Sequence, residues 1–288
     1  MKRILIISVI CLLAGQNAYP ASTWITRDMP GAISTKVYGI NGSNLVGSAD
    51  IHGFFYDGTN WTALDMPVAN RTYIHGIDGS NLVGSYSTVF GDIRGFLYNG
   101  TTWTSLNAPG ASWTGANGIQ GNNIVGYYIG DGTHGFLYNG TTWTILDMPG
   151  VRKTVISGID ASNLVGYYGD ASGYYHGFLY DGTNWTTLDV PGAAETSIYG
   201  IDGSNFVGSY KDASGIYHGF LYDGTNWTTL DMTGANNTTI YGISGDNLVG
   251  YYWDNPNFEH GFVYTIPEPA TVFLLGFGVI LARKKLFQ

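Results

Sequence analysis

Six copies of one short glycine-rich motif divide most of the chain into units of about 42 residues. The clearest copies read YGIDGSNFVG from Tyr199 and YGISGDNLVG from Tyr241. The first glycine of the motif recurs at Gly39, Gly76, Gly118, Gly158, Gly200 and Gly242. A period of this length predicts a repeat architecture, in which each unit buries its apolar surface against its neighbours.

Each unit contains four short runs that are rich in aromatic and β-branched residues, which favour strands. In the fifth unit these runs are 196–201, 205–210, 218–222 and 226–230. The sequences Asp-Gly-Ser-Asn and Asp-Gly-Thr-Asn separate the first run from the second and the third from the fourth. Both are hairpin signals, because glycine and asparagine accept the positive φ of tight turns. No helical period is present in the repeats.

Four strands in about 42 residues match the size of a β-propeller blade. The sixth unit stops after its third strand, at residues 260–264, whereas the N-terminal WITRDMPG from Trp24 matches WTILDMPG from Trp143. We therefore predict an all-β fold, a six-bladed β-propeller whose N-terminal strand completes the last blade. An open solenoid or a barrel would need no such complement, and closure removes exposed sheet edges.

The loop between the second and third strands is the only part of the unit whose length varies. In an up-and-down sheet this loop shares one face of the ring with the Asp-Met-Pro-Gly connections, and the tight turns share the opposite face. Variable loops on a rigid scaffold commonly carry binding residues, although drift of unconstrained loops produces the same pattern. We predict a ligand face here, with the aromatic candidates Trp113, Tyr174, Tyr175 and Trp253.

The first 21 residues are typical of a secretory signal peptide. Lys2 and Arg3 precede an apolar run at residues 4–14, which is too short for an ordinary membrane helix. Cleavage is expected between Ala18 and Ser22. The single cysteine, Cys11, lies inside the apolar run, so the processed protein has no disulfide and no thiolate chemistry.

Residues 266–288 form a second targeting segment after the repeat domain, which we place at residues 22–265. Pro267, Glu268 and Pro269 precede a thirteen-residue apolar stretch, 270–282, and the basic residues Arg283, Lys284 and Lys285. A helix of that length covers about 20 Å of a hydrocarbon layer of about 30 Å. The basic residues orient its end toward the cytoplasm.

This order of motif, short apolar helix and basic end resembles the PEP-CTERM sorting signal of Gram-negative bacteria. The resemblance implies a stay in the inner membrane, cleavage by an exosortase-type membrane protease, and delivery to the cell surface or exopolysaccharide matrix. A plain C-terminal transmembrane anchor is the alternative.

A second resemblance covers residues 24–264. The sequence His-Gly-Phe-Leu-Tyr, with Gly-Ile-Asp and Asn-Leu-Val-Gly before it, is similar to the HAF family of extracellular repeats. This chain has glycine where the family has alanine, and Arg94 replaces the histidine in the second unit. The resemblance implies an extracellular repeat protein, and it implies no catalytic residue.

Charge narrows the range of partners. Between the two targeting segments the chain has seven basic and twenty acidic residues, a net charge of −13. This charge disfavours nucleic acids and anionic membranes, whose phosphates require basic surfaces. Neutral glycans, such as an extracellular polysaccharide, and cations remain compatible.

Two recurring residue types suggest metal sites. In five of the six units a histidine precedes Gly-Phe, but equivalent positions in a ring point away from one another, whereas metal ligands must converge. Asp170, Asp212 and Asp254 recur in the variable loops, yet no second carboxylate lies near them in sequence to complete a calcium site. We therefore expect structural histidines, turn-forming aspartates, no metal and no cofactor.

The sequence shows no catalytic constellation. Glu195 and Glu259 are the only glutamates of the repeat domain, and they belong to different units, whereas glycosidases need two carboxylates at one bond. The tryptophan repeated in every unit is expected to pack in the core. We predict a non-enzymatic protein that binds exopolysaccharide or another glycan. The alternatives are a hydrolase or lyase of matrix polysaccharide, an ice-binding protein using threonines such as Thr186 and Thr187, and a purely structural surface protein.

Overall fold

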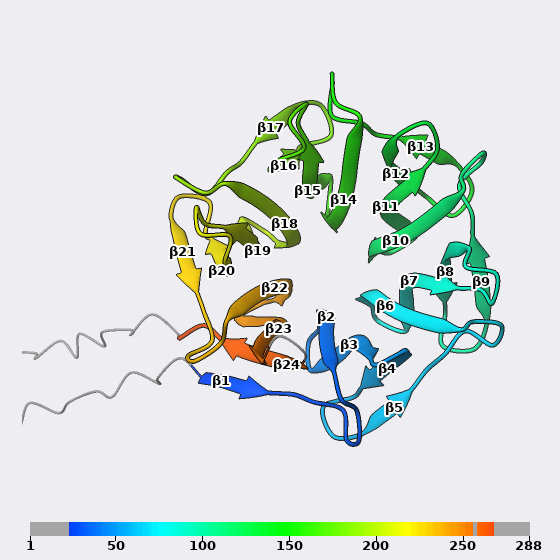
Figure 1. The fold of residues 1–288 in the computed structure, drawn as a ribbon. Helices are drawn as coiled ribbons and strands as arrows, with labels where there is room; N and C mark the ends of the chain where they lie inside the picture. The colour runs from blue at the N-terminus through cyan, green and yellow to red at the C-terminus, as the bar shows by residue number, and fades with distance from the viewer. Residues whose placement is uncertain (1–22, 256–257, 268–288) are drawn as a thin grey trace, which may run out of the picture.

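A computed structural model describes residues 23–255 and 258–267, which form six four-stranded antiparallel blades around a central axis (Figure 1). Blade one contains β2 (Thr35–Asn41), β3 (Asn44–Ala49), β4 (His52–Tyr56) and β5 (Trp61–Ala63), and blade two contains β6 (Arg71–Asp78), β7 (Asn81–Ser87), β8 (Ile93–Tyr98) and β9 (Trp103–Leu106). Blade three contains β10 (Trp113–Gln120), β11 (Asn123–Ile129), β12 (Thr133–Tyr138) and β13 (Trp143–Ile145), and blade four contains β14 (Lys153–Asp160), β15 (Asn163–Gly169), β16 (Tyr175–Tyr180) and β17 (Trp185–Thr187). Blade five contains β18 (Glu195–Asp202), β19 (Asn205–Lys211), β20 (Tyr217–Tyr222) and β21 (Trp227–Leu230), and blade six contains β22 (Asn237–Ser244), β23 (Asn247–Asn255), β24 (Phe258–Thr265) and β1 (Thr23–Thr26).

The N-terminal strand completes the last blade, as predicted. β1 pairs antiparallel with β24, from Thr23 opposite Thr265 to Thr26 opposite Phe262. The ring centroid of Trp24 lies 4.8 Å from that of Phe262 and 4.7 Å from that of Tyr264. Residues more than 230 positions apart in the sequence therefore close the ring, and β24 has no exposed edge.

Each blade buries one phenylalanine of its third strand and covers it with the tryptophan of its fourth strand. The six phenylalanines are at most 1% exposed: Phe54, Phe96, Phe136, Phe178, Phe220 and Phe262. Their ring centroids lie 4.8–5.0 Å from those of the tryptophans, in edge-to-face geometry. The clusters include side chains of the neighbouring blade, such as Val46 beside Phe96, so the core lies between blades.

We expect Trp185→Ala to lower the free energy of unfolding by about 2 kcal/mol. A fully buried tryptophan would cost roughly 3–5 kcal/mol, but Trp185 is only partly buried where it covers Phe178. Urea denaturation measures the change, with Ile145→Ala as the control because Ile145 is 59% exposed. An unfolding midpoint equal to that of the wild type would contradict the packing role.

The first glycine of the motif allows neighbouring blades to approach at the axis. A Cβ added at Gly39 would lie 2.8 Å from the backbone oxygen of His75 in the next blade. Across the closing seam, a Cβ at Gly242 would lie 3.0 Å from the backbone oxygen of Tyr38. The recurrence of this glycine therefore reflects a steric requirement that is repeated around the ring.

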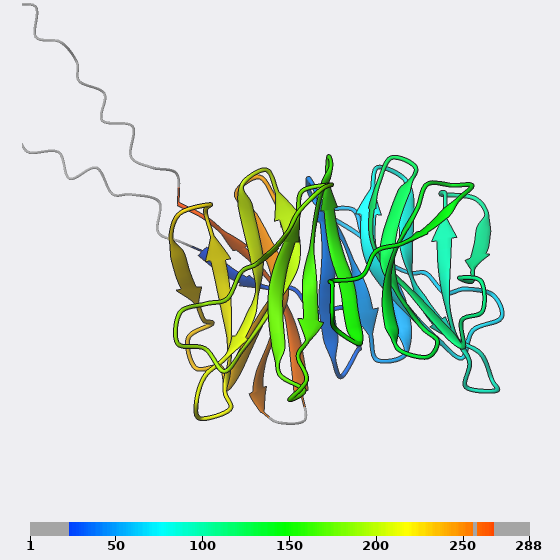
Figure 2. The same cartoon turned by 90° about the horizontal axis from the view of Figure 1, so that it is seen from above.

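The predicted division into two faces is also present. The two tight turns of blade one lie together, since a Cβ added at Gly58 would lie 3.4 Å from the side chain of Ser43. On the opposite face, the amide of Thr72 donates a hydrogen bond to the carbonyl of Ile51, which joins a strand-two loop to the following connection. We call these the turn face and the loop face; Figure 2 shows the ring from its side.

The predicted signal peptide, the transmembrane segment, Glu268, Pro269, Arg283, Lys284 and Lys285 lie outside the described residues. Pro267 is the last residue of the described part. Within residues 23–255 and 258–267, no helix has the length and apolarity to cross a membrane.

Candidate functional site

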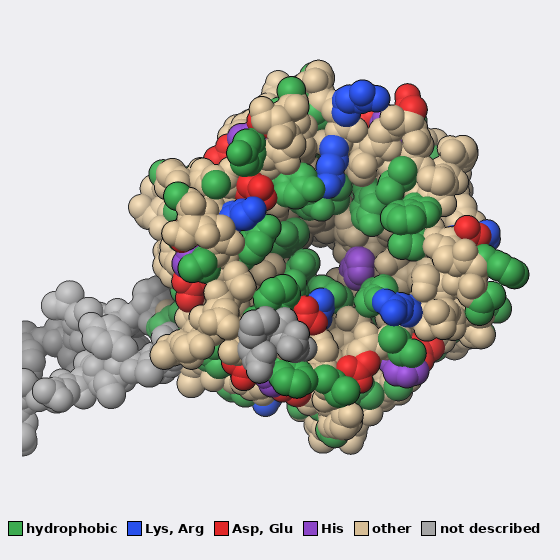
Figure 3. All heavy atoms as spheres, viewed as in Figure 1, with side chains coloured by type: hydrophobic (Ala, Val, Ile, Leu, Met, Phe, Trp, Pro, Cys, Tyr) green, Lys and Arg blue, Asp and Glu red, His purple; other side chains and the backbone are tan. Residues whose placement is uncertain are grey.

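A cavity of about 380 Å³ opens between blades five and six on the loop face. Five aromatic side chains contribute to its wall: Tyr199, Tyr217, Tyr241, Tyr251 and Trp253. Ser209, Asn237 and Thr239 add hydroxyl and amide groups. Its lining contains no ionisable group other than tyrosine. We call it the interblade cavity. Figure 3 shows the loop face of the ring.

The interblade cavity lies beside blade five, in which one cross-strand pair between the first and second strands consists of two small residues. In blade five this pair is Ser197 opposite Ser209. The other blades have one large side chain in the same pair: Lys36 opposite Ser48, Tyr73 opposite Ser85, Tyr127 opposite Gly115, Tyr167 opposite Val155, and Tyr251 opposite Thr239. In blade three the tyrosine fills the space beside a glycine, since a Cβ at Gly115 would lie 2.7 Å from the ring of Tyr127. The missing bulk in blade five therefore leaves space beside Ser209.

Glu259 fixes the tryptophan that forms one wall of the interblade cavity. The indole Nε1–H of Trp253 donates to Glu259 Oε1 over 3.1 Å. The other contacts of this carboxylate come from blade one, where Lys36 Nζ lies 2.7 Å away and Ser34 Oγ donates over 2.6 Å. Lys36 also lies 4.9 Å from the ring centroid of Tyr251. These bonds across the closing seam restrict the rotamer of Trp253.

A second bond joins the two sides of the interblade cavity. The backbone amide of Tyr217 donates to Oδ1 of Asn237 over 2.8 Å. This bond assigns the orientation of the amide, so the Nδ2 donors of Asn237 are directed away from Tyr217, and no residue in the described part of the chain accepts from them.

The three buried tyrosines of the interblade cavity, Tyr199, Tyr241 and Tyr251, stay neutral over the physiological pH range. Burial raises the pKa of Tyr251 to about 12, and burial also raises the pKa values of Tyr199 and Tyr241. Tyr199 stacks on Tyr241 with a centroid separation of 4.4 Å, and Tyr241 stacks on Tyr251 at 5.6 Å. The site therefore offers aromatic faces, hydroxyl groups and one amide, a chemistry suited to neutral ligands.

Only one of the four aromatic residues predicted for ligand binding lines the interblade cavity. Trp253 does, whereas Trp113 begins β10 in blade three and is 42% exposed. Tyr174 is also exposed, and Tyr175 begins β16 in blade four, where its hydroxyl accepts a hydrogen bond from Lys153. The four residues lie in three different blades, so the interblade cavity brings only Trp253 into one site, and the predicted ligand face stays a prediction.

Sequence reasoning missed Tyr199, Tyr241 and Tyr251. Tyr199 and Tyr241 directly precede the motif glycine, so they belong to a pattern that indicates scaffold. The sequence contained a usable signal, because the residue directly before the motif glycine varies among the six units while the residues around it repeat. The six varying residues are Tyr38, His75, Asn117, Ser157, Tyr199 and Tyr241.

The repeated histidines join the loop face to the connections. In five blades the Nδ1 atom of this histidine lies 2.7–2.8 Å from a carboxylate oxygen of an aspartate. Each aspartate belongs to the connection that leads to the innermost strand of the next blade, which is β2, β6, β14, β18 or β22. The pairs are His52–Asp65, His134–Asp147, His176–Asp189, His218–Asp231 and His260–Asp28. The same aspartate accepts the amide of the following glycine, as Asp189 does from Gly177. In blade two, both residues of the pair are different: Arg94 replaces the histidine, and Asn107 replaces the aspartate.

Aspartates of the variable loops contact the other ring nitrogen of four of these histidines. Asp131 lies 2.9 Å from His134, and Asp254 lies 3.3 Å from His260. Asp170 and Asp212 also form turns with backbone amides of their own loops. Within the described residues, no group of three or more His, Cys, Asp or Glu side chains could hold a metal ion.

We expect thermal stability to fall as the pH rises from 6 to 9. The carboxylate of Asp147 raises the pKa of His134; burial opposes protonation of His176, His218 and His260, but their aspartate partners outweigh it and raise those pKa values too. A raised native pKa stabilises the fold fully below the ordinary value of 6.5, and this contribution is lost as the pH rises through the native pKa values. Calorimetry should show a Tm lower by a few degrees at pH 9, since about 1 kcal/mol corresponds to roughly 2–4 °C.

A variant with glutamine at His134, His176, His218 and His260 is the control for this pH dependence. Its Tm should change much less between pH 6 and 9. An equal decrease in the variant and the wild type would assign the effect to other groups.

The two glutamates of the described residues belong to different blades, and each is paired with a lysine. Glu195 in blade five lies 3.6 Å from Lys211, and Glu259 in blade six is bound to Lys36. Thr186 and Thr187, the candidates for ice binding, lie on the short outer strand β17. The outer strands of the six blades face different directions around the ring (Figure 1).

Comparison with known proteins shows similarity at the level of fold. No family model matches the sequence, and no curated protein matches it. The SapL1 lectin in complex with alpha methyl fucoside is 17% identical with a TM-score of 0.55, over 83% of this chain and 98% of that one. A triple arginine-to-alanine mutant of AofleA from Arthrobotrys oligospora is 13% identical with a TM-score of 0.55, over 85% and 87% of the two chains. The Trypanosoma rangeli sialidase is 10% identical with a TM-score of 0.51, over 86% of this chain but only 60% of its own.

Proposed function

We propose that this protein is a non-enzymatic glycan-binding protein of the bacterial cell surface or extracellular matrix, and that the interblade cavity holds one sugar unit. The observation that carries the proposal is the aromatic wall formed by Tyr217, Tyr251 and Trp253 around the polar groups of Ser209 and Asn237. The C–H face of a pyranose packs on aromatic rings, while its hydroxyls need donors and acceptors at the rim.

The likeness to the SapL1 lectin, determined with alpha methyl fucoside, gives the proposal further weight. The charge of the protein favours a neutral glycan over an anionic one. Only blade five has small residues at both positions of this cross-strand pair. The proposal therefore includes a single site per ring.

The cellular location of the protein is a separate part of the proposal. The N-terminal signal, the Pro267-Glu268-Pro269 motif and the basic C-terminal end support export, a stay in the inner membrane and processing by an exosortase-type protease. The HAF resemblance of the repeats is consistent with an extracellular site. Mass spectrometry of the mature protein, isolated from the cell surface, tests this part. A mature form that retains residues 283–285 would contradict it.

A glycan array followed by calorimetric titration tests the binding function. We expect the purified protein to bind a neutral glycan or the producing organism's exopolysaccharide, with a stoichiometry of one for the interblade cavity. Hydrolysis or elimination products from the bound glycan would reject the non-enzymatic assignment. The absence of binding to every neutral glycan and to the exopolysaccharide would reject the binding function and leave a structural surface protein.

A further inference from the structure

We infer that the axis of the ring contains a second binding site, which shares only Tyr199 and Tyr241 with the interblade cavity, for one small neutral molecule rich in hydroxyl groups, such as a monosaccharide. Two cavities of about 240 Å³ each share Tyr38, His75, Asn117, Tyr199 and Tyr241 in their walls. Space of this size holds many times the volume of one water molecule. This inference goes beyond the proposed function, because it does not need the interblade cavity.

The fold itself directs these side chains to the axis. Each innermost strand has a bulge directly before the motif glycine; in β6 the register shifts between Ile74 and Gly76, which leaves His75 unpaired. A bulge re-aims the side chain of the unpaired residue. The flanking residues repeat from blade to blade, but the bulged position differs, so the axis has distinct polar and aromatic sides.

The bonds of Asn117 define the chemistry of the polar side. Asn117 Nδ2 donates to the carbonyl of Ile156 over 2.9 Å, and this assigns Oδ1 to the side of His75. His75 Nδ1 lies 3.2 Å from this oxygen, so it bears the proton and donates. His75 Nε2 is then a hydrogen-bond acceptor, and burial lowers the pKa of the ring, which keeps it neutral.

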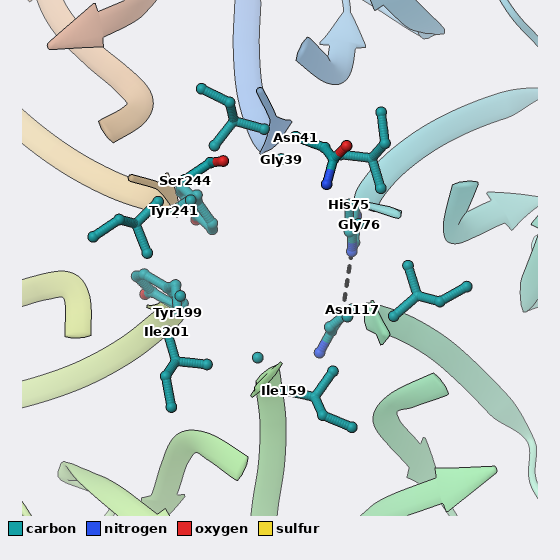
Figure 4. Close-up of a pocket in the computed structure, with 18 of the residues that line it drawn as sticks. Gly39, Asn41, His75, Gly76, Asn117, Ile159, Tyr199, Ile201, Tyr241 and Ser244 are labelled. Carbon is teal, nitrogen blue, oxygen red and sulfur yellow. Dashed lines mark hydrogen bonds between the residues drawn. The ribbon is translucent and has the colours of Figure 1, made fainter. Parts of the chain in front are cut away.

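The aromatic side lies opposite. Figure 4 shows Tyr199 and Tyr241 across the cavity from His75 and Asn117. An apolar ligand face can pack on the tyrosine rings while a hydroxyl on the other side donates to Nε2. Ser157 adds a further hydroxyl to the wall.

The charged groups that line the two axial cavities disfavour anions. The groups at the bulged positions are neutral, because burial raises the pKa values of Tyr38, Tyr199 and Tyr241. In the lining of the two cavities, carboxylates stand only at the turn-face mouth, where they accept backbone amides of the next blade: Asp78 from Gly121 over 2.6 Å, Asp160 from Gly203 over 2.8 Å, and Asp202 from Gly245 over 2.7 Å. The carboxylates at the mouth therefore repel anions. They already accept hydrogen bonds from backbone amides, and they do not reach the bulged residues, where a bound cation would need a counterion.

The test is saturation-transfer NMR and titration of the full mature protein with D-glucose, D-galactose, D-mannose and L-fucose, with glucuronate and choline as charged probes. Three variants probe the axis. His75→Ser removes Nε2, His75→Gln keeps an acceptor near its position, and Ser157→Tyr fills the cavity with the residue that Tyr38, Tyr199 and Tyr241 already provide in other blades. Trp253→Ala removes the interblade wall, and thermal unfolding confirms that each variant is folded.

We expect at least one neutral sugar to bind in the Trp253→Ala background. His75→Ser and Ser157→Tyr should weaken that binding by roughly tenfold or more, and His75→Gln should largely preserve it. The inference is overturned if no sugar binding depends on His75 and Ser157, or if the axis prefers choline or glucuronate. Binding that depends on His75 but not on Trp253 would support the axial site, while loss of glycan binding in Trp253→Ala with His75 intact tests the interblade site by itself, so the two proposals fail separately.

Discussion

Deletion of residues 23–28 should abolish cooperative folding of the whole ring, the largest effect on stability that we expect. The deletion removes the four residue pairs between β1 and β24, the ring contacts of Trp24 with Phe262 and Tyr264, and the bond from Asp28 to His260. Phe262 would become exposed, and β24 would present an unpaired edge that promotes aggregation. Because the core lies between blades, the loss in blade six also removes support from blades five and one.

Calorimetry and size-exclusion chromatography measure this effect. Replacement of Val89 and Phe90 by serine and glycine is the control, since these loop residues are 76% and 89% exposed. The deletion variant should show no cooperative transition, or should elute as aggregates. A monomer with a Tm equal to that of the control would show that five complete blades are sufficient, and would contradict the account of closure.

Trp253→Ala should weaken glycan binding in the interblade cavity by roughly tenfold to a hundredfold, equivalent to about 1.4–2.7 kcal/mol of binding free energy. Trp253 supplies a rigid wall whose indole is held by Glu259, so the side chain needs little ordering when a ligand binds. The matched control is Trp113→Ala, which removes the same side chain from a partly exposed position in blade three.

Titration with the glycan identified on the array separates the outcomes. Full affinity in Trp113→Ala with reduced affinity in Trp253→Ala supports the interblade site. Equal losses in both variants would place the ligand across the loop face, and unchanged affinity in both would remove the interblade cavity from the binding function.

The fold was predictable from the sequence because every scaffold element occurs several times. The match between the sequences at Trp24 and Trp143 predicted the closing strand, although nothing local to either segment indicates that β1 pairs with β24. Constant spacing between repeated residues carried this long-range information. Strand bounds were predicted within one or two residues, since Asp-Gly turns limit the ends of the hairpins.

The candidate site was predictable only in part. Trp253 departs from the repeat and was found for that reason, whereas Tyr241 and Tyr251 resemble scaffold residues. The cavity depends on bulk that is missing at Ser197 and Ser209, and absent volume is visible only when the cross-strand pairs are known. The separation of Trp113 from Trp253 around the ring could not be predicted, because sequence variability does not specify the angle between blades.

The pairing of β1 with β24 also determines how the ring responds to mechanical force. Thr23 and Thr265 lie opposite each other at one end of this antiparallel ladder, so the chain leaves both strands at the same end. Tension applied through these two ends separates the strands one pair at a time, as in a zipper, instead of shearing all pairs together. The seam that completes the ring is therefore its weakest point under load, and a pull on both ends would open blade six first.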